Sequence, residues 1–187
     1  MKETISNSLI WNKAAVTGVV FAAVTITCGL LAKGLAALQL NGFVSGLLSF
    51  LIWAAQFGGC IWLMIFFMKK LVAGYDGVTN SDTNRYGRRI ALFSAILIAV
   101  VNFFILYFTP EAKMQEMIDE ALGAYGSMLD SNSLAMMEEM LQNLPVLTFF
   151  GNLIYCFLYG TILSAILSRN IPAPDPFAQT GTSQEQQ

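Results

Sequence analysis

The chain contains no histidine, and only 12% of its 187 residues are charged. A soluble domain carries roughly 25% charged residues, so about half of the usual charge is missing. Without histidine the chain lacks the commonest metal ligand and the commonest general base. Its net charge of −2 offers no basic stripe for nucleic acid. The composition therefore argues against nucleic-acid binding and against most acid–base and metal chemistry.

The chain also has few cysteines and no recognisable arrangement of catalytic residues. Three thiols lie in three different apolar runs: Cys28, Cys60 and Cys156. Their spacing matches no zinc or redox motif, so we interpret them as packing residues. No serine or threonine stands beside a base, and no carboxylates are paired in a catalytic pattern. We expect a protein that is not an enzyme and that has no cofactor.

Long apolar runs dominate what is present. Four segments contain no Asp, Glu, Lys or Arg: residues 14–32, 43–68, 90–108 and 146–168. Runs of roughly 18 or more such residues are typical of membrane-spanning helices. The first run is longer than the roughly 7–15 apolar residues of a signal peptide, so we interpret it as an uncleaved helix. The predicted fold is an all-α integral membrane protein with four transmembrane helices.

Lysine and arginine predict the orientation. Eight of them fall in residues 1–13, the loop 69–89 and the tail 169–187, whereas the other two loops hold Lys33 and Lys113 alone. Since basic loops stay in the cytoplasm, both termini and the loop 69–89 are predicted to be cytoplasmic. Residues 72–86 are rich in small polar residues and predict a flexible loop. The proline-containing tail 169–187 predicts disorder. Asp76, Asn80 and Asp82 match a calcium-binding loop too poorly to indicate one.

The outer loop, residues 109–145, has two amphipathic stretches that predict a helical hairpin. Thr109-Pro110-Glu111 is a helix start, and Asp130 begins a second cap. Seven apolar residues follow helical spacing and are predicted to turn inward or toward a partner: Met114, Met117, Ile118, Leu122, Met137, Met140 and Leu141. Glu116, Asp119, Glu120 and Glu139 are predicted to face water. Methionine also binds Cu(I), but an apolar stripe explains these residues without copper.

Three amides lie within the predicted spans: Gln56, Asn102 and Asn152. Asn102 and Asn152 both lie about 9 Å below the outer surface, on helices joined by one loop. We predict that they face each other and form a hydrogen bond, with a substrate contact as the alternative. Glycines such as Gly18, Gly58 and Gly160 predict close helix packing, within the chain or between copies. The lack of ionisable residues in the spans argues against a proton-coupled pump.

The order of these parts resembles a known family, the domain of unknown function numbered 4199. The resemblance rests on Tyr86-Gly87, on Ser94 in the third helix, on Thr109-Pro110-Glu111 and on the acidic, methionine-rich stretch before Pro145. It implies a small four-helix inner-membrane protein of a Gram-negative bacterium. Family members are encoded near polyprenyl-phosphate glycosyltransferases, which implies such an enzyme as a membrane partner. The family has no established activity, so the resemblance implies no catalytic residue.

The expected function is a non-enzymatic accessory or scaffold subunit of the bacterial inner membrane. Its expected partners are the lipid bilayer and either a membrane protein or further copies of this chain. The alternative is a small oligomeric transporter or a lipid-handling protein. A polar cavity containing Gln56 and Asn102 would favour transport, whereas an exposed apolar patch on the outer hairpin would favour the scaffold.

Overall fold

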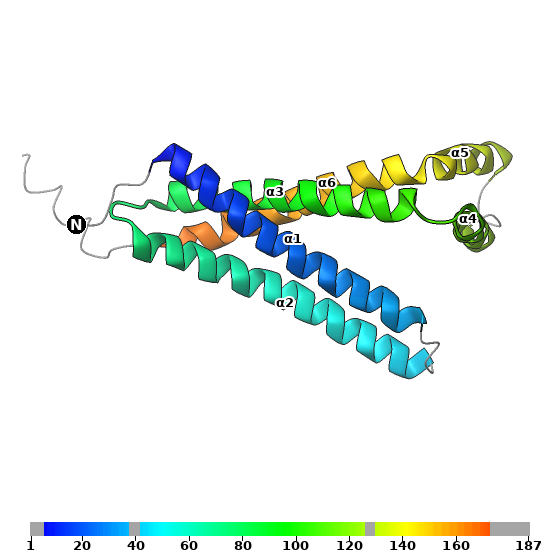
Figure 1. Ribbon diagram of the computed structural model, residues 1–187, viewed down its shortest axis with the longest axis horizontal. Helices are drawn as coiled ribbons and strands as arrows, with labels where there is room; N and C mark the ends of the chain where they lie inside the picture. The colour runs from blue at the N-terminus through cyan, green and yellow to red at the C-terminus, as the bar shows by residue number, and fades with distance from the viewer. Residues whose placement is uncertain (1–5, 38–41, 126–129, 173–187) are drawn as a thin grey trace, which may run out of the picture. The chain divides into compact units, whose positions relative to one another are not determined.

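The computed structural model describes residues 6–37, 42–125 and 130–172 (Figure 1). These residues are helical almost throughout and contain no strand. The elements are α1 (Asn7–Ala37), α2 (Gly42–Gly74), α3 (Asn80–Tyr107), α4 (Glu111–Tyr125), α5 (Ser131–Gln142), α6 (Leu144–Leu167) and the 3-10 turn η2 (Ser168–Asn170). The predicted all-α class is therefore confirmed. The first five residues and most of the tail, 173–187, lie outside the described residues.

Four of these helices are long and apolar enough to cross a membrane, as predicted. The candidate spans are Asn7–Leu35, Phe43–Gly74, Asn80–Tyr107 and Leu144–Asn170. Each contains nearly all of one predicted apolar run. A helix of 28 residues, such as α3, is about 42 Å long, more than the roughly 30 Å hydrocarbon core. In α3 the excess length is the first part of the helix, residues 80–89, which is rich in polar and basic residues.

The predicted flexible loop over 72–86 is wrong for most of its length. Helix α2 continues to Gly74 and α3 begins at Asn80, so a short link of five residues, 75–79, joins them. The Asp82 carboxylate accepts from Thr79 N at 3.1 Å and from Thr79 Oγ1 at 2.7 Å. Asp82 N in turn donates to Thr79 Oγ1 at 3.2 Å. This reciprocal capping box starts the helix, although the sequence around it is small and polar.

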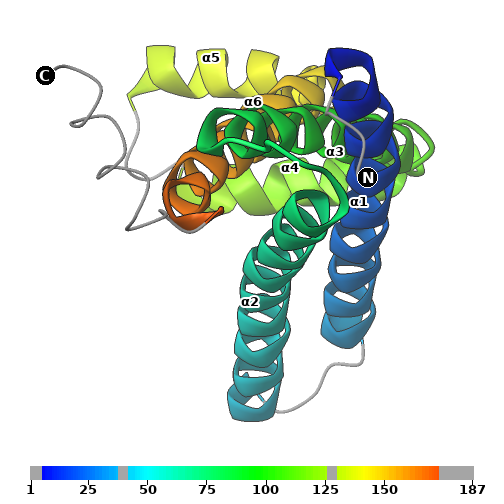
Figure 2. The same ribbon diagram turned by 90° about the vertical axis from the view of Figure 1, so that its left-hand side faces the viewer.

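The chain divides into two compact units. Unit 1 is Met1–Ser94 with Phe157–Gln187, and unit 2 is Ala95–Cys156. In unit 1, α1 packs along α2, as Figures 1 and 2 show from two directions. The buried core of unit 1 includes Met64, Met68 and Ile90 from α2 and α3, together with Ile171 from the segment after η2.

Glycine allows close helix contacts at three places in unit 1. A Cβ at Gly18 would lie 2.6 Å from Phe93 Cβ and 3.3 Å from Ile90 O, so α1 crosses α3 here. A Cβ at Gly87 would collide with Ser164 and Met68, and one at Gly160 would collide with Ala91. The predicted close packing is thus confirmed at Gly18 and Gly160. At Gly58 no atom lies within 4 Å of such a Cβ, and the same holds at Gly29, Gly46, Gly59 and Gly151, so close packing between copies stays a prediction at these positions.

In unit 2, α4 and α5 contact each other, and Ile118 of α4 is buried. Asp130 caps α5 by accepting from Ser133 N at 3.1 Å, as predicted. The predicted cap at Thr109 is wrong, since its hydroxyl donates to Ile105 O of α3 at 2.7 Å. Pro110 O accepts the first helical bonds of α4, because the preceding threonine still completes α3.

Candidate functional site

One end of unit 1 gathers segments that are far apart in the sequence. Arg89 of α3 donates to Asn7 Oδ1 at 2.6 Å and to Asn7 O at 3.3 Å. Its guanidinium lies 4.7 Å from the centre of the Trp11 ring. The Lys13 ammonium lies 5.3 Å from the centre of the Tyr75 ring in the α2–α3 link. We call this region the basic end. Its described basic residues are Lys13, Lys69, Lys70, Arg85, Arg88, Arg89 and Arg169.

Side chains at the start of α3 bind the carbonyl groups at the end of α6. Asn80 Nδ2 donates to Ser168 O at 2.7 Å and to Arg169 O at 3.0 Å. The Thr83 hydroxyl, which is fully buried, donates to Ile171 O at 2.6 Å. The last carbonyls of a helix have no partner within it, so these bonds cap α6 from another helix. They hold residues 168–172 at the basic end.

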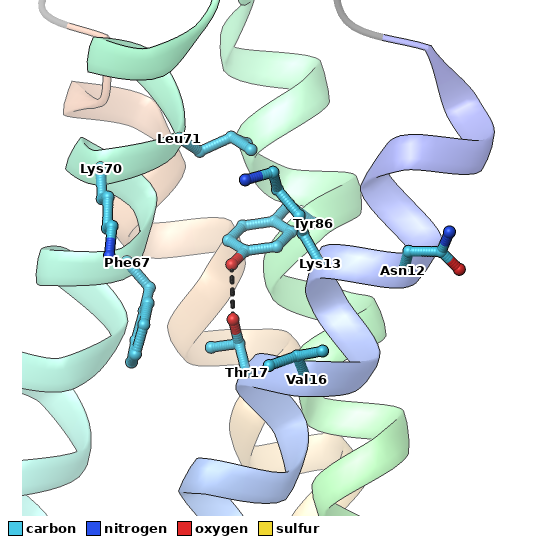
Figure 3. Close-up of a pocket in the computed structure, with 8 residues that line it drawn as sticks. All are labelled: Asn12, Lys13, Val16, Thr17, Phe67, Lys70, Leu71 and Tyr86. Atoms are coloured by element: carbon cyan, nitrogen blue, oxygen red, sulfur yellow. Dashed lines mark hydrogen bonds between the residues drawn. The ribbon is translucent and has the colours of Figure 1, made fainter.

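A cavity of about 360 Å³ opens at the basic end between α1, α2 and α3. It is lined by Asn12, Lys13, Val16, Thr17, Phe67, Lys70, Leu71 and Tyr86. Figure 3 shows the hydrogen bond that joins the Thr17 and Tyr86 hydroxyls, which measures 2.8 Å, with Lys13 extending from α1 toward the Tyr86 ring and Lys70 on α2. Tyr86 and Thr17 are buried, whereas both lysines are exposed. We call this cavity the basic pocket; its lining includes two cations and no carboxylate.

A second cavity, also of about 360 Å³, lies in unit 2 where α5 leads into α6. It is an open groove lined by Met136, Glu139, Met140, Asn143, Val146, Leu147 and Phe150. Met136 is 66% exposed and Met140 is 51% exposed. Pro145 lies in the first turn of α6, where its missing N–H breaks the backbone bonding between the two helices. We call this feature the α5–α6 groove.

The three predicted amides are all half-buried. Asn152 Nδ2 donates to Thr148 O of its own helix at 2.9 Å, which leaves its Oδ1 as the atom able to accept from Asn102. The pairing of Asn102 with Asn152 stays a prediction. Gln56 belongs to unit 1 and Asn102 to unit 2, and neither residue lines the basic pocket or the α5–α6 groove.

The seven apolar residues of the predicted hairpin differ in solvent exposure. Ile118 is buried, and Met114, Leu122, Met137 and Leu141 are half-buried. Met117 is 45% exposed and Met140 51%. The four acidic residues predicted to face water, Glu116, Asp119, Glu120 and Glu139, are exposed. Whether the stripe serves as a lid or a docking surface stays a prediction.

Sequence reasoning missed the basic pocket. From the sequence, Lys13 and Lys70 are interpreted as charges that flank apolar runs. Thr17 and Tyr86 are interpreted as ordinary polar residues of helices. One local signal was available: Lys13 and Thr17 are four residues apart, so they share a helix face. The contribution of α2 and α3 depends on packing between distant segments, which periodicity does not reveal.

Comparisons with known proteins add no relative, since no family model, curated protein or solved structure matches the chain. The resemblance to the domain of unknown function numbered 4199 therefore stays a prediction.

Proposed function

We propose that the chain is a non-enzymatic accessory protein of the bacterial inner membrane. In this proposal the four long helices cross the bilayer, both termini are cytoplasmic, and α4 and α5 form a hairpin outside. The basic residues support this orientation, because basic loops stay in the cytoplasm. The contacts of Arg89 with Asn7 and of Asn80 with Ser168 also support it, since they join the start of α1 and the end of α6 to the same end of unit 1.

The observation that carries the proposal is the residue spacing along the α5–α6 groove. Met136, Met140, Asn143, Leu147 and Phe150 are separated by four, three, four and three residues. This alternation is the seam that one helix presents to another in a coiled coil. It continues from α5 into α6 past Pro145. A seam of this kind fits a partner helix that leaves the membrane beside α6.

The composition of the groove also favours a protein partner. Methionine adapts its shape to a partner surface, and exposed apolar patches commonly mark interaction sites. Asn143 is the polar member of the seam, and a single polar residue at such a position fixes the register of a partner helix. The resemblance described above makes a polyprenyl-phosphate glycosyltransferase the partner to test first.

Site-specific photo-crosslinking in native membranes tests this function. A photoreactive residue at position 140 is expected to form one discrete adduct with another membrane protein, whereas one at Glu120, on the acidic face of α4, is not. Met140→Gln with a crosslinker at 136 should weaken the adduct but leave stability within about 0.5 kcal/mol of the parent, as at most exposed positions.

Each result decides between the scaffold and its rivals. An adduct of twice the chain's own mass would show that the partner is a second copy of this chain and not another protein. Equal adducts from positions 140 and 120 would refute a defined docking surface. Loss of folding in detergent on Met140→Gln would mean that the groove is packed within the chain and acts as a lid.

A further inference from the structure

We propose that the basic pocket binds the phosphate of one anionic phospholipid, with its acyl chains against the apolar part of the lining. This inference goes beyond the accessory function and shares no residue with the α5–α6 groove.

The charges of the pocket suit a phosphate. Lys13 of α1 and Lys70 of α2 come from different helices to one cavity (Figure 3). Among the described residues, neither ammonium has a carboxylate within ion-pair distance. Asp76 and Asp82 are the described acids of the basic end, and the Asp82 carboxylate is bound by Thr79. The two lysines therefore leave a positive charge at the pocket that an anion would neutralise.

The Thr17–Tyr86 pair adds directed hydrogen bonding. Two hydroxyls carry two protons, and the 2.8 Å bond between them uses one. The second proton can be donated to a ligand oxygen, because a hydroxyl that accepts one bond still keeps its own donor. Both residues are buried, so their positions are fixed by packing. A phosphate in this cavity would accept from a hydroxyl of the pair, and the two lysines line the same cavity.

The apolar part of the lining selects a lipid over a soluble phosphate. Val16, Phe67 and Leu71 share the cavity with the lysines, and Val16 is 69% exposed. Val16 and Phe67 lie within the predicted spans 14–32 and 43–68, where an exposed side chain faces hydrocarbon. Basic pockets between spanning helices on the cytoplasmic side are a known arrangement for anionic headgroups. A free phosphate would leave this apolar part of the cavity unused.

Lipid binding to the full chain in detergent tests the proposal. Native mass spectrometry would compare phosphatidylglycerol with phosphatidylcholine, and inorganic phosphate would be added as a soluble competitor. We expect one tightly held phosphatidylglycerol per chain. The double variant Lys13→Gln/Lys70→Gln should lose roughly 30-fold in affinity, about fivefold for each lysine. Lys69→Gln is the matched control, since it removes the neighbouring charge outside the pocket and should keep the parent affinity.

Two further variants guard against misfolding. Lys13→Arg/Lys70→Arg keeps both charges and should retain phosphatidylglycerol binding. Thr17→Val/Tyr86→Phe, which removes both hydroxyls, should weaken it while the helical content stays constant. Equal binding of the two lipids would overturn the proposal, as would an equal loss in Lys69→Gln. Displacement of phosphatidylglycerol by millimolar inorganic phosphate would show that the ligand is a soluble phosphate and would refute the lipid assignment.

Discussion

The basic end of unit 1 and the α4–α5 region of unit 2 differ in how far their hydrogen bonds reach along the sequence. At the basic end, Asn80, Thr83 and Arg89 join residues more than 80 positions apart. In the α4–α5 region, the described side-chain bonds stay within a turn, as in Gln115 to Asp119 and Asp130 to Ser133. The basic end is therefore held by hydrogen bonds to distant parts of the chain, whereas the side-chain hydrogen bonds of the α4–α5 region are local.

This difference fits the two proposals. Binding one lipid phosphate needs groups from three helices held at fixed distances, and long-range bonds with buried hydroxyls supply that order. Docking a partner helix needs an exposed face that can adapt, and local caps maintain the helices without filling the face. Substitutions in the two regions should therefore differ in their effect on stability.

Gly87→Ala should give the largest loss of stability. The new Cβ would collide with the Ser164 side chain and with Met68, so α6 or α2 must move. Overpacking of this kind costs about 1–3 kcal/mol. Thermal unfolding in detergent would measure it, and the double variant Gly87→Ala/Ser164→Gly should recover part of the loss. Gly58→Ala, with nothing near its Cβ, should leave stability unchanged or slightly raised. Equal effects at the two glycines would refute the described packing.

Asn80→Ala should give the second-largest loss. It removes the donor for Ser168 O and Arg169 O and leaves these carbonyls of the α6 terminus without that partner. We expect a loss of about 1–2 kcal/mol and faster hydrogen exchange at the end of α6. Ser81→Ala, at the exposed next position of the same helix, is the control. Unchanged exchange in residues 160–170 of the Asn80 variant would mean that long-range capping does not hold the basic end.

How well the sequence predicts a structural feature depends on how far apart in the chain the interacting residues lie. The four spans are predictable because each apolar run is continuous, and Asp130 is predictable because its cap acts three residues away. Thr79-x-x-Asp82 was an equally local signal, but the polar composition around it favoured a loop. The bonds from Asn80 to Ser168 and the meeting of Lys13 with Lys70 depend on tertiary packing, so no local pattern could reveal them.

The smallest expected effect is the pH dependence of the cap on α5. Hydrogen bonds from the Ser133 side chain and amide hold the pKa of Asp130 below its ordinary value. A carboxylate with a lowered folded-state pKa stabilises the fold above its unfolded pKa of roughly 3.9, and this stability is lost as pH falls through the folded value. Hydrogen exchange at the Ser133 amide should therefore be more protected at pH 6 than at pH 3, after correction for intrinsic rates. Asp130→Asn should keep the cap and lose this pH dependence, because asparagine also caps helices but does not titrate. At the basic end, the end of α6 is held by the Asn80 amide and the Thr83 hydroxyl, which do not titrate in this range, so protection at the end of α6 should stay constant. A parallel loss at both places would indicate general acid unfolding and would remove the contrast between local and long-range capping.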